Sequence, residues 1–160
     1  MQSSGKPEKA RKYVRQRFGV EIDNISGLGF REVSGDVWLS SAQETGLEPE
    51  TCGIRAVRFM DIGLKPTTYF LQLMGDRISG NVVEVDRKDF KALLSGEMIE
   101  RKGVKDPEAS VSDENSWNAS GKGYVAVKFE GKVYGCGFYM DELVSSRIPE
   151  GRAKELLGTL

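Results

Sequence analysis

The sequence contains no histidine and only two cysteines, Cys52 and Cys136, among its 160 residues. Without histidine there is no Ser-His or Cys-His nucleophile pair, no HExxH zinc site and no imidazole, the commonest transition-metal ligand. Two isolated cysteines make neither a disulfide framework nor a zinc site, and we expect both to be small buried residues. We therefore expect no metal, no cofactor and no catalytic residues, and only carboxylate or lysine chemistry would remain for an enzyme.

Long apolar runs are also missing. No stretch approaches the ~18 apolar residues that a membrane helix requires, and the first nine residues lack the apolar core of a signal peptide. We therefore expect a cytoplasmic protein that has no membrane partner. Its hydrophobic content of 39% and charged content of 29% are typical of a soluble globular protein, and its length suits one domain or two small ones.

The net charge of −1 hides an uneven distribution. Residues 1–18 carry six basic residues against Glu8, a balance of +5 (6 − 1), so the rest of the chain carries −6. The basic residues are Lys6, Lys9, Arg11, Lys12, Arg15 and Arg17. This segment either faces an anionic partner or is a solvated helix surface.

The first half of the chain predicts helices and strands. Ala10, Tyr13, Val14 and Phe18 form one apolar stripe at helical spacing, and Gly19 ends that helix. The expected elements are a helix at 7–18, a hairpin at 30–40 that turns at Ser34-Gly35-Asp36, a polar loop or short helix at 43–53, a strand at 54–62 and a helix at 65–74 that has Pro66 near its start.

The second half alternates between strands and helices. Asp86 is a good N-cap for a helix whose buried stripe is Phe90, Leu93 and Leu94. The expected elements are a strand at 81–85, a helix at 87–94, a strand at 97–100, a mobile or functional loop at 103–123, a hairpin at 124–139, an extended segment at 143–149 and a helix at 150–157.

The hairpin at 124–139 has an unusual glycine pattern. Val125, Val127 and Phe129 alternate with less apolar residues, and Glu130-Gly131 supplies the turn. A two-residue loop would place Val127 opposite Tyr134 and Val125 opposite Cys136. The other face would then pair Ala126 with Gly135 and Tyr124 with Gly137, and would have little bulk. Such a bare face indicates either close internal packing or the approach of a ligand.

These motifs resemble the PUA domain, which is named for pseudouridine synthase and archaeosine transglycosylase. The resemblance covers roughly residues 78–160. It is carried by Val82-Val83-Glu84-Val85-Asp86, by Ala92-Leu93-Leu94-Ser95-Gly96-Glu97, by Gly123-Tyr124-Val125-Ala126-Val127 and by Gly135-Cys136-Gly137.

Two segments extend the likeness. Lys65-Pro66-Thr67-Thr68-Tyr69 and Ser146-Arg147-Ile148-Pro149-Glu150-Gly151-Arg152 are similar to the RNA-binding C-terminal region of Sun-type RNA cytosine-5 methyltransferases. The first half is similar to the pre-PUA domains of archaeal PUA proteins and of Nip-type ribosome biogenesis factors. The resemblance implies an α+β fold, with a pre-PUA α/β subdomain at 1–77 and, at 78–160, a PUA-like mixed β-barrel that has a short inserted helix.

The chain departs from the methyltransferases, because it lacks the S-adenosylmethionine-binding domain and its nucleophile segment. Thr51-Cys52-Gly53 is similar to that segment only superficially, and Glu150 stands where a basic residue is expected. The resemblance therefore implies RNA binding and no catalysis.

The resemblance also implies which residues would contact RNA. Cations would bind phosphates, and planar side chains would stack on exposed bases. The expected RNA-binding residues are Lys65, Thr67 and Thr68, whose helix start has free N–H groups; Lys128, Lys132 and Tyr134 on the hairpin; and Ser146, Arg147 and Arg152 after it, with Trp117 and Tyr139 as further stacking groups. The fold it implies also favours RNA access to Gly135 and Gly137 over close packing.

We therefore expect a non-catalytic protein that binds structured RNA, tRNA or rRNA, in RNA modification, processing or ribosome assembly, and no DNA. The alternative is a protein-interaction adaptor in a ribonucleoprotein, or an accessory subunit of an RNA-modifying enzyme. Its partners would then include that enzyme or a ribosome assembly factor.

Overall fold

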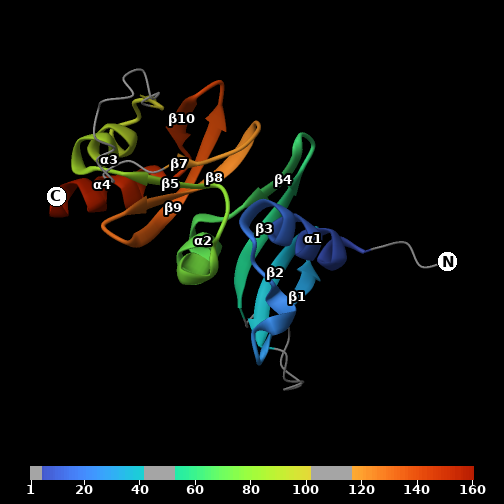
Figure 1. The fold of residues 1–160 in the computed structure, drawn as a ribbon. Coiled ribbons are helices and arrows are strands. Elements are labelled where there is room, and N and C mark those ends of the chain that lie inside the picture. Colours follow the sequence, from blue (N-terminus) through green and yellow to red (C-terminus); the bar gives the residue numbers. More distant parts are fainter. Residues whose placement is uncertain (1–4, 42–52, 102–116) are drawn as a thin grey trace. The chain divides into compact units, whose positions relative to one another are not determined.

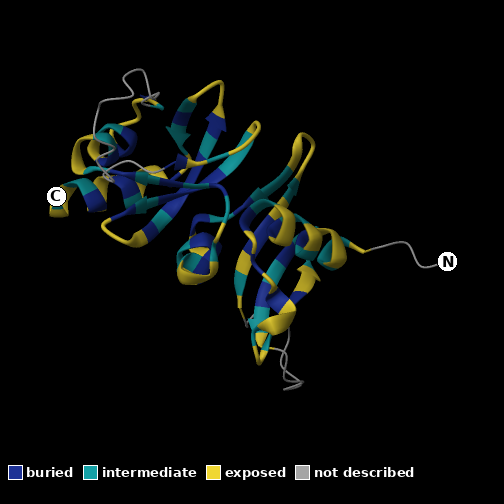
Figure 2. Cartoon of the chain, in the orientation of Figure 1, coloured by how far each residue is buried: buried dark blue, intermediate teal, exposed yellow. Residues whose placement is uncertain are grey.

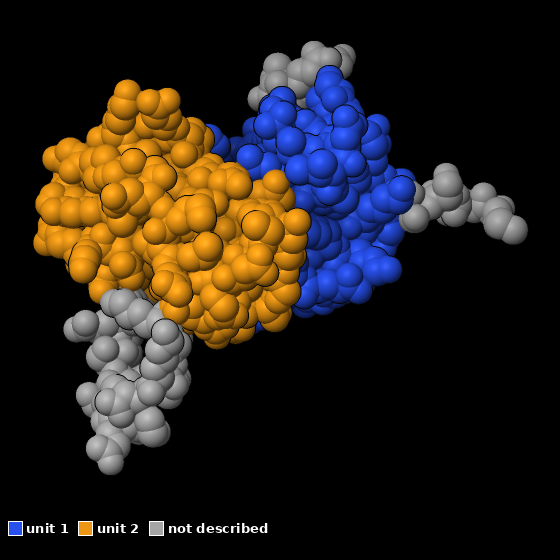
Figure 3. All heavy atoms as spheres, turned by 90° about the horizontal axis from the view of Figure 1, so that it is seen from above, with its two compact units in different colours: residues 1–80 blue, residues 81–160 orange. Residues whose placement is uncertain are grey.

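The computed structural model describes residues 5–41, 53–101 and 117–160. The chain divides into two compact units, Met1–Gly80 and Asn81–Leu160, here called unit 1 and unit 2 (Figure 3). The described residues form four α-helices and two β-sheets, so the expected mixed α+β class is confirmed (Figure 1). The predictions for 43–53 and for most of 103–123 fall outside the described residues.

Unit 1 contains one antiparallel sheet of four strands in sequence order. Helix α1 packs on strands β1 and β2, and helix α2 packs on β3. Its elements are α1 (Lys6–Phe18), the 3-10 helix η1 (Ile22–Asn24), β1 (Leu28–Val33), β2 (Asp36–Ser41), β3 (Ile54–Met60), β4 (Gly63–Pro66), α2 (Thr68–Met74) and the 3-10 helix η3 (Gly75–Arg77).

Helix α1 and the first hairpin form as their sequences predict. Ala10, Val14 and Phe18 are buried along one stripe, and Gly19 ends the helix with a positive φ of 71°. The turn between β1 and β2 has positive φ at Ser34 and Gly35, which matches the twist of a two-residue hairpin loop.

The helix expected to start around Pro66 begins later. Lys65 and Pro66 belong to β4, where they pair with Arg58 and Val57. β4 is an edge strand, and an edge tolerates a proline that has no N–H to donate. Thr67 instead caps α2, because its side-chain oxygen accepts a hydrogen bond from the Phe70 N–H at 3.2 Å.

Unit 2 contains a six-stranded sheet in the order β6-β10-β9-β8-β5-β7. Strands β5 and β8 are parallel, and the other neighbouring pairs are antiparallel. Its elements are β5 (Val82–Val85), α3 (Arg87–Leu94), β6 (Ile99–Glu100), β7 (Trp117–Asn118), β8 (Gly123–Phe129), β9 (Lys132–Met140), β10 (Leu143–Ser146) and α4 (Glu150–Thr159).

One hydrophobic core fills unit 2. Asp86 caps α3 as predicted, because its side chain accepts a hydrogen bond from the Asp89 N–H at 2.8 Å. Phe90 then stacks on Phe129 with ring centroids 4.7 Å apart. Figure 2 shows the buried residues concentrated along the strand interiors and the exposed residues at the turns. Cys136 is buried, as expected, whereas Cys52 lies outside the described residues.

The two ends of this sheet meet, so the sheet curls. Arg101 directly follows β6, and its Nη2 donates a hydrogen bond to the Trp117 carbonyl of β7 at 3.0 Å. The Trp117 ring also meets the Tyr139 ring of β9 edge-on at 6.4 Å. β6 and β7 are the outermost strands of the order, so these contacts bend the sheet around the core.

The register of the β8–β9 hairpin differs from our prediction. Phe129 pairs with Lys132 and Lys128 with Val133, as a two-residue turn requires, but Val127 pairs with Gly135. Tyr134 is therefore the extra residue of a β-bulge, and every later partner moves by one position.

The shift removes the predicted bare face. Gly137 lies opposite Val125, a fully buried residue. A Cβ atom on Gly137 would lie 3.1 Å from Val127 Cγ2 and 3.2 Å from Val144 Cγ1. Gly135 is also buried. Close packing is thus the role of Gly137, and the prediction of RNA access to its backbone is wrong.

Candidate nucleic-acid interface

The predicted group at the start of α2 is engaged within unit 1. The Thr67 N–H donates to the Ala56 carbonyl at 2.9 Å, and its hydroxyl donates to the Arg55 carbonyl at 2.6 Å. Thr68 is 6% exposed, and Lys65 is a half-buried residue of β4. The N–H groups of Thr67 and Phe70 already have acceptors, so the prediction that this helix start offers free N–H groups is wrong for them.

The predicted group on the β8–β9 hairpin lies beside the core. The Tyr134 ring is half-buried and contacts Phe90 with centroids 5.1 Å apart. The Lys132 ammonium lies 5.4 Å from the Tyr134 ring centroid. Lys128, also half-buried, occupies the register position beside Glu84 of β5. The structure thus brings Lys132 and Tyr134 together, and it gives the tyrosine a packing role.

Arg147 and its neighbours form an open cluster. The guanidinium carbon of Arg147 lies 5.4 Å from the Phe138 ring centroid. Its Nη1 donates to the Ser145 Oγ at 2.8 Å and to the Ser146 carbonyl at 3.2 Å. The Ser146 side-chain oxygen accepts from the Ile148 N–H, which fixes the turn that carries the arginine.

A tyrosine completes this cluster. Tyr124 meets Phe138 edge-on with ring centroids 5.1 Å apart. Tyr124, Phe138 and Ser145 lie directly opposite one another on β8, β9 and β10, so their side chains share one face of the sheet. We call Tyr124, Phe138, Ser145 and Arg147 the Phe138 platform.

Arg152 stands in a different environment from Arg147. It lies on α4, where its Nη1 contacts the Glu155 carboxylate at 3.1 Å, one helical turn away. Arg147 is exposed and forms no ion pair with any residue that the structure describes. The two arginines that we predicted together therefore differ in available charge.

The two further stacking groups are buried, so that part of the prediction is wrong. Trp117 is 9% exposed and Tyr139 is 5% exposed, both within the core of unit 2. The Tyr139 hydroxyl donates to Glu142 Oε1 at 2.7 Å. This hydrogen bond, and secondly burial, raise the pKa of Tyr139 above its ordinary value of 10.0.

The bulge at Tyr134 explains both the error at Tyr139 and the omission of Phe138. Without a bulge, Phe138 would share the inner face with Val125 and Val127, and Tyr139 would point outward. One extra residue exchanges the two faces of the strand. The sequence contains Gly135 next to the bulge, but no pattern that fixes the position of the bulge.

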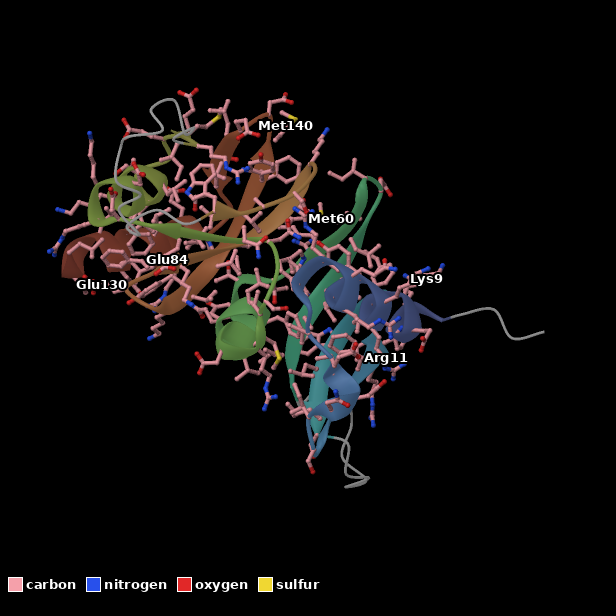
Figure 4. All side chains as sticks on the ribbon, viewed as in Figure 1. Lys9, Arg11, Met60, Glu84, Glu130 and Met140 are labelled. Atoms are coloured by element: carbon pink, nitrogen blue, oxygen red, sulfur yellow. The ribbon has the colours of Figure 1, made fainter. Side chains whose placement is uncertain are left out.

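The basic charge of α1 is partly neutralised within unit 1. Arg11 pairs with Glu8 at 2.9 Å and with Asp23 at 3.4 Å. Lys6 donates to the Gly35 carbonyl at 2.9 Å. Lys9, labelled in Figure 4, remains exposed. The helix thus presents fewer available cations than its sequence contains.

Neither a metal cluster nor a membrane span is found in the described part of the chain. None of its cysteine, aspartate and glutamate residues form a group of three or more that could hold a metal ion. Across residues 5–41, 53–101 and 117–160, no helix is long and apolar enough to cross a membrane. Compared with models of known families and with curated proteins, the chain matches none.

Proposed function

We propose that the protein is a non-catalytic RNA-binding protein that holds structured RNA, tRNA or rRNA, during RNA modification, processing or ribosome assembly. The observation that carries this proposal is the Phe138 platform, where an exposed arginine lies over an aromatic ring on a sheet face. Proteins recognise unpaired bases by stacking them on aromatic rings and on guanidinium planes.

The chemistry of Arg147 supports RNA as the ligand. Only its Nη1 group has a hydrogen-bond acceptor among the described residues, so Nε and Nη2 remain to bind phosphate oxygens. The outer face of the same guanidinium offers a plane for a base. One side chain thus provides both interactions that a nucleotide requires.

The fold supports the same proposal. In unit 2 a sheet curls around one core, and α3 is inserted between β5 and β6, an arrangement compatible with the PUA-like barrel that the sequence motifs resemble. We infer that unit 2 is a PUA-like domain and that unit 1 is its pre-PUA partner.

A titration of the full chain with total tRNA and with rRNA, at two salt concentrations, tests the proposal. We expect binding that weakens as salt increases, because phosphate contacts release counterions. Arg147→Ala should weaken binding by ~1 kcal/mol or more. Arg152→Ala is the matched control, because Glu155 already pairs with that arginine. Absence of binding at low salt, or equal losses for the two variants, would contradict the proposal.

A protein-interaction adaptor remains the second candidate, because two methionines of unit 2 are exposed. Met98, just before β6, is 58% exposed. Met140, at the end of β9 and labelled in Figure 4, is 42% exposed. Exposed apolar side chains occur at protein interfaces. Purification after nuclease treatment separates the two functions: a protein partner that persists favours the adaptor, and loss of every partner favours RNA binding.

A further inference from the structure

Unit 1 carries an aromatic residue between two arginines. Arg31 of β1 pairs with Trp38 of β2, and Trp38 pairs with Arg55 of β3. Directly opposite residues share one face of a sheet, so the three side chains form one row across three strands. We call these residues the Trp38 row.

The row lies on the face away from the core of unit 1. Val37 and Leu39, on either side of Trp38, are 0% and 2% exposed and point into that core. Phe30 of β1 meets Phe70 of α2 there, with ring centroids 5.8 Å apart. Since side chains alternate along a strand, Trp38 points to the opposite face.

Arg55 is held against the tryptophan. Its guanidinium carbon lies 5.7 Å from the Trp38 ring centroid, and its Nε lies 3.6 Å from the Asp36 carboxylate. Asp36 is itself fixed, because it accepts a hydrogen bond from the Phe59 N–H at 2.8 Å. Ala56 is the extra residue of a bulge, which sets Arg55 opposite Trp38.

Arg31 provides the available cation. It is exposed, and no residue of the described ranges forms an ion pair with it. A polyanion that approached the row would therefore meet one cation already paired with a carboxylate and a second that is unpaired.

Two small residues, Gly29 and Ser40, lie next to Trp38 on the same face of the sheet, and we call this pair the Gly29 strip. No described atom lies within 4 Å of the position that a Cβ atom on Gly29 would occupy. A glycine inside a strand often marks the close approach of a ligand. Among the described residues, the position beside Trp38 on this face is therefore open at Gly29.

We propose that the Trp38 row is a binding site for single-stranded RNA, in which an unpaired base stacks against Trp38 and the adjoining phosphates contact Arg31 and Arg55. Aromatic rings flanked by cations bind single strands in this way. An acidic peptide would use the charges but leave the indole ring and the Gly29 strip without a role. The site goes beyond the function proposed for unit 2, because it does not depend on the Phe138 platform.

Tryptophan fluorescence gives a direct readout. The chain has two tryptophans; Trp117 is buried in unit 2, whereas Trp38 is half-buried on the open face. Titration of the full chain with a short oligouridylate should quench fluorescence, and Trp38→Phe should remove most of that quenching. Arg31→Ala should weaken binding about tenfold. Quenching unchanged in Trp38→Phe would overturn the site.

Two controls identify the ligand and separate the two proposals. Polyglutamate should not quench Trp38, and equal quenching by polyglutamate would overturn base stacking in favour of an acidic protein. Phe138→Ala should leave the quenching of Trp38 intact, so the site can stand even if the function proposed for unit 2 fails.

Gly29→Val tests the strip itself. It should fold normally, as judged by circular dichroism and thermal unfolding, because an added Cβ atom would meet no described atom within 4 Å. The same variant should lose most of the quenching. A folded Gly29→Val protein that is quenched like the original would refute the strip as part of the site.

Discussion

The two units place an arginine over an aromatic ring in different settings. In unit 1, Arg55 lies 5.7 Å from Trp38, and Arg31 occupies the register position opposite Trp38 on β1. In unit 2, Arg147 lies 5.4 Å from Phe138, and Tyr124 meets the Phe138 ring edge-on. The comparison indicates that unit 1 sets one aromatic ring among two arginines, whereas unit 2 sets two aromatic rings beside one arginine.

The sheets differ in how they use glycine. Gly137 of unit 2 faces the core and is closely surrounded, whereas no described atom lies within 4 Å of the Cβ position of Gly29 in unit 1. The same residue type thus has a packing role in one unit and, in our proposal, a ligand-access role in the other.

The largest expected effect is on stability, and it should differ between valine substitutions at these two glycines. Gly137→Val should lower the free energy of unfolding by about 1–3 kcal/mol, because its side chain would overpack against Val127 and Val144. Gly29→Val should change it by less than about 0.5 kcal/mol. Urea unfolding of both variants provides the measurement, and equal losses would remove the contrast between the sheets.

The second-largest expected effect is a loss of RNA affinity when the Phe138 ring is removed. Phe138→Ala should cost about 1–3 kcal/mol of binding free energy, as removal of a stacking surface does, with little change in the salt dependence. Phe138→Tyr keeps the ring and serves as the control. Fluorescence anisotropy with labelled tRNA measures both, and a Phe138→Ala affinity equal to that of the original chain would contradict the stacking role.

Removal of the unit 1 charge should chiefly change the salt dependence. Arg31→Ala together with Arg55→Ala should reduce the slope of log K against log salt by about 1.4, which corresponds to two phosphate contacts on a single strand. Lys88→Ala with Lys154→Ala removes two exposed cations from outside both sites. If both double variants change the slope equally, the charge of the Trp38 row has no special role.

The smallest effect concerns the hydrogen bond from the Tyr139 hydroxyl to Glu142 in unit 2. The folded state raises the pKa of Tyr139, so this group stabilises the fold below about pH 10 and the contribution is lost as pH rises through the folded-state pKa. Tyr139→Phe should cost about 0.5–1.5 kcal/mol near neutral pH. The difference in stability between the two proteins should shrink in alkaline solution, and a difference that stays constant with pH would contradict this linkage.

Local signals in the sequence predicted most elements of the fold. The cap at Asp86, the stripe of Ala10, Val14 and Phe18 and the glycine turns were sufficient, because each acts within a few residues. Bulges at Ala56 and Tyr134 were not predictable, since they depend on cross-strand packing. The bulge at Tyr134 reversed the faces of β9, so Tyr139 was expected outside and Phe138 was overlooked.

The Trp38 row was missed for a related reason. Arg31, Trp38 and Arg55 lie on three different strands, and only the register of the sheet brings them together. The basic helix, by contrast, was visible in the sequence, but its ion pairs with Glu8 and Asp23 were not.

Ultraviolet crosslinking of the full chain to bound RNA, with the crosslinked peptides identified by mass spectrometry, tests the central claim most directly. We predict crosslinks at Phe138 or Tyr124 in unit 2 and at Trp38 in unit 1. Crosslinks confined to α1, at residues such as Lys9 and Lys12, would instead show that RNA binds through the basic helix and would contradict recognition by the two sheet faces.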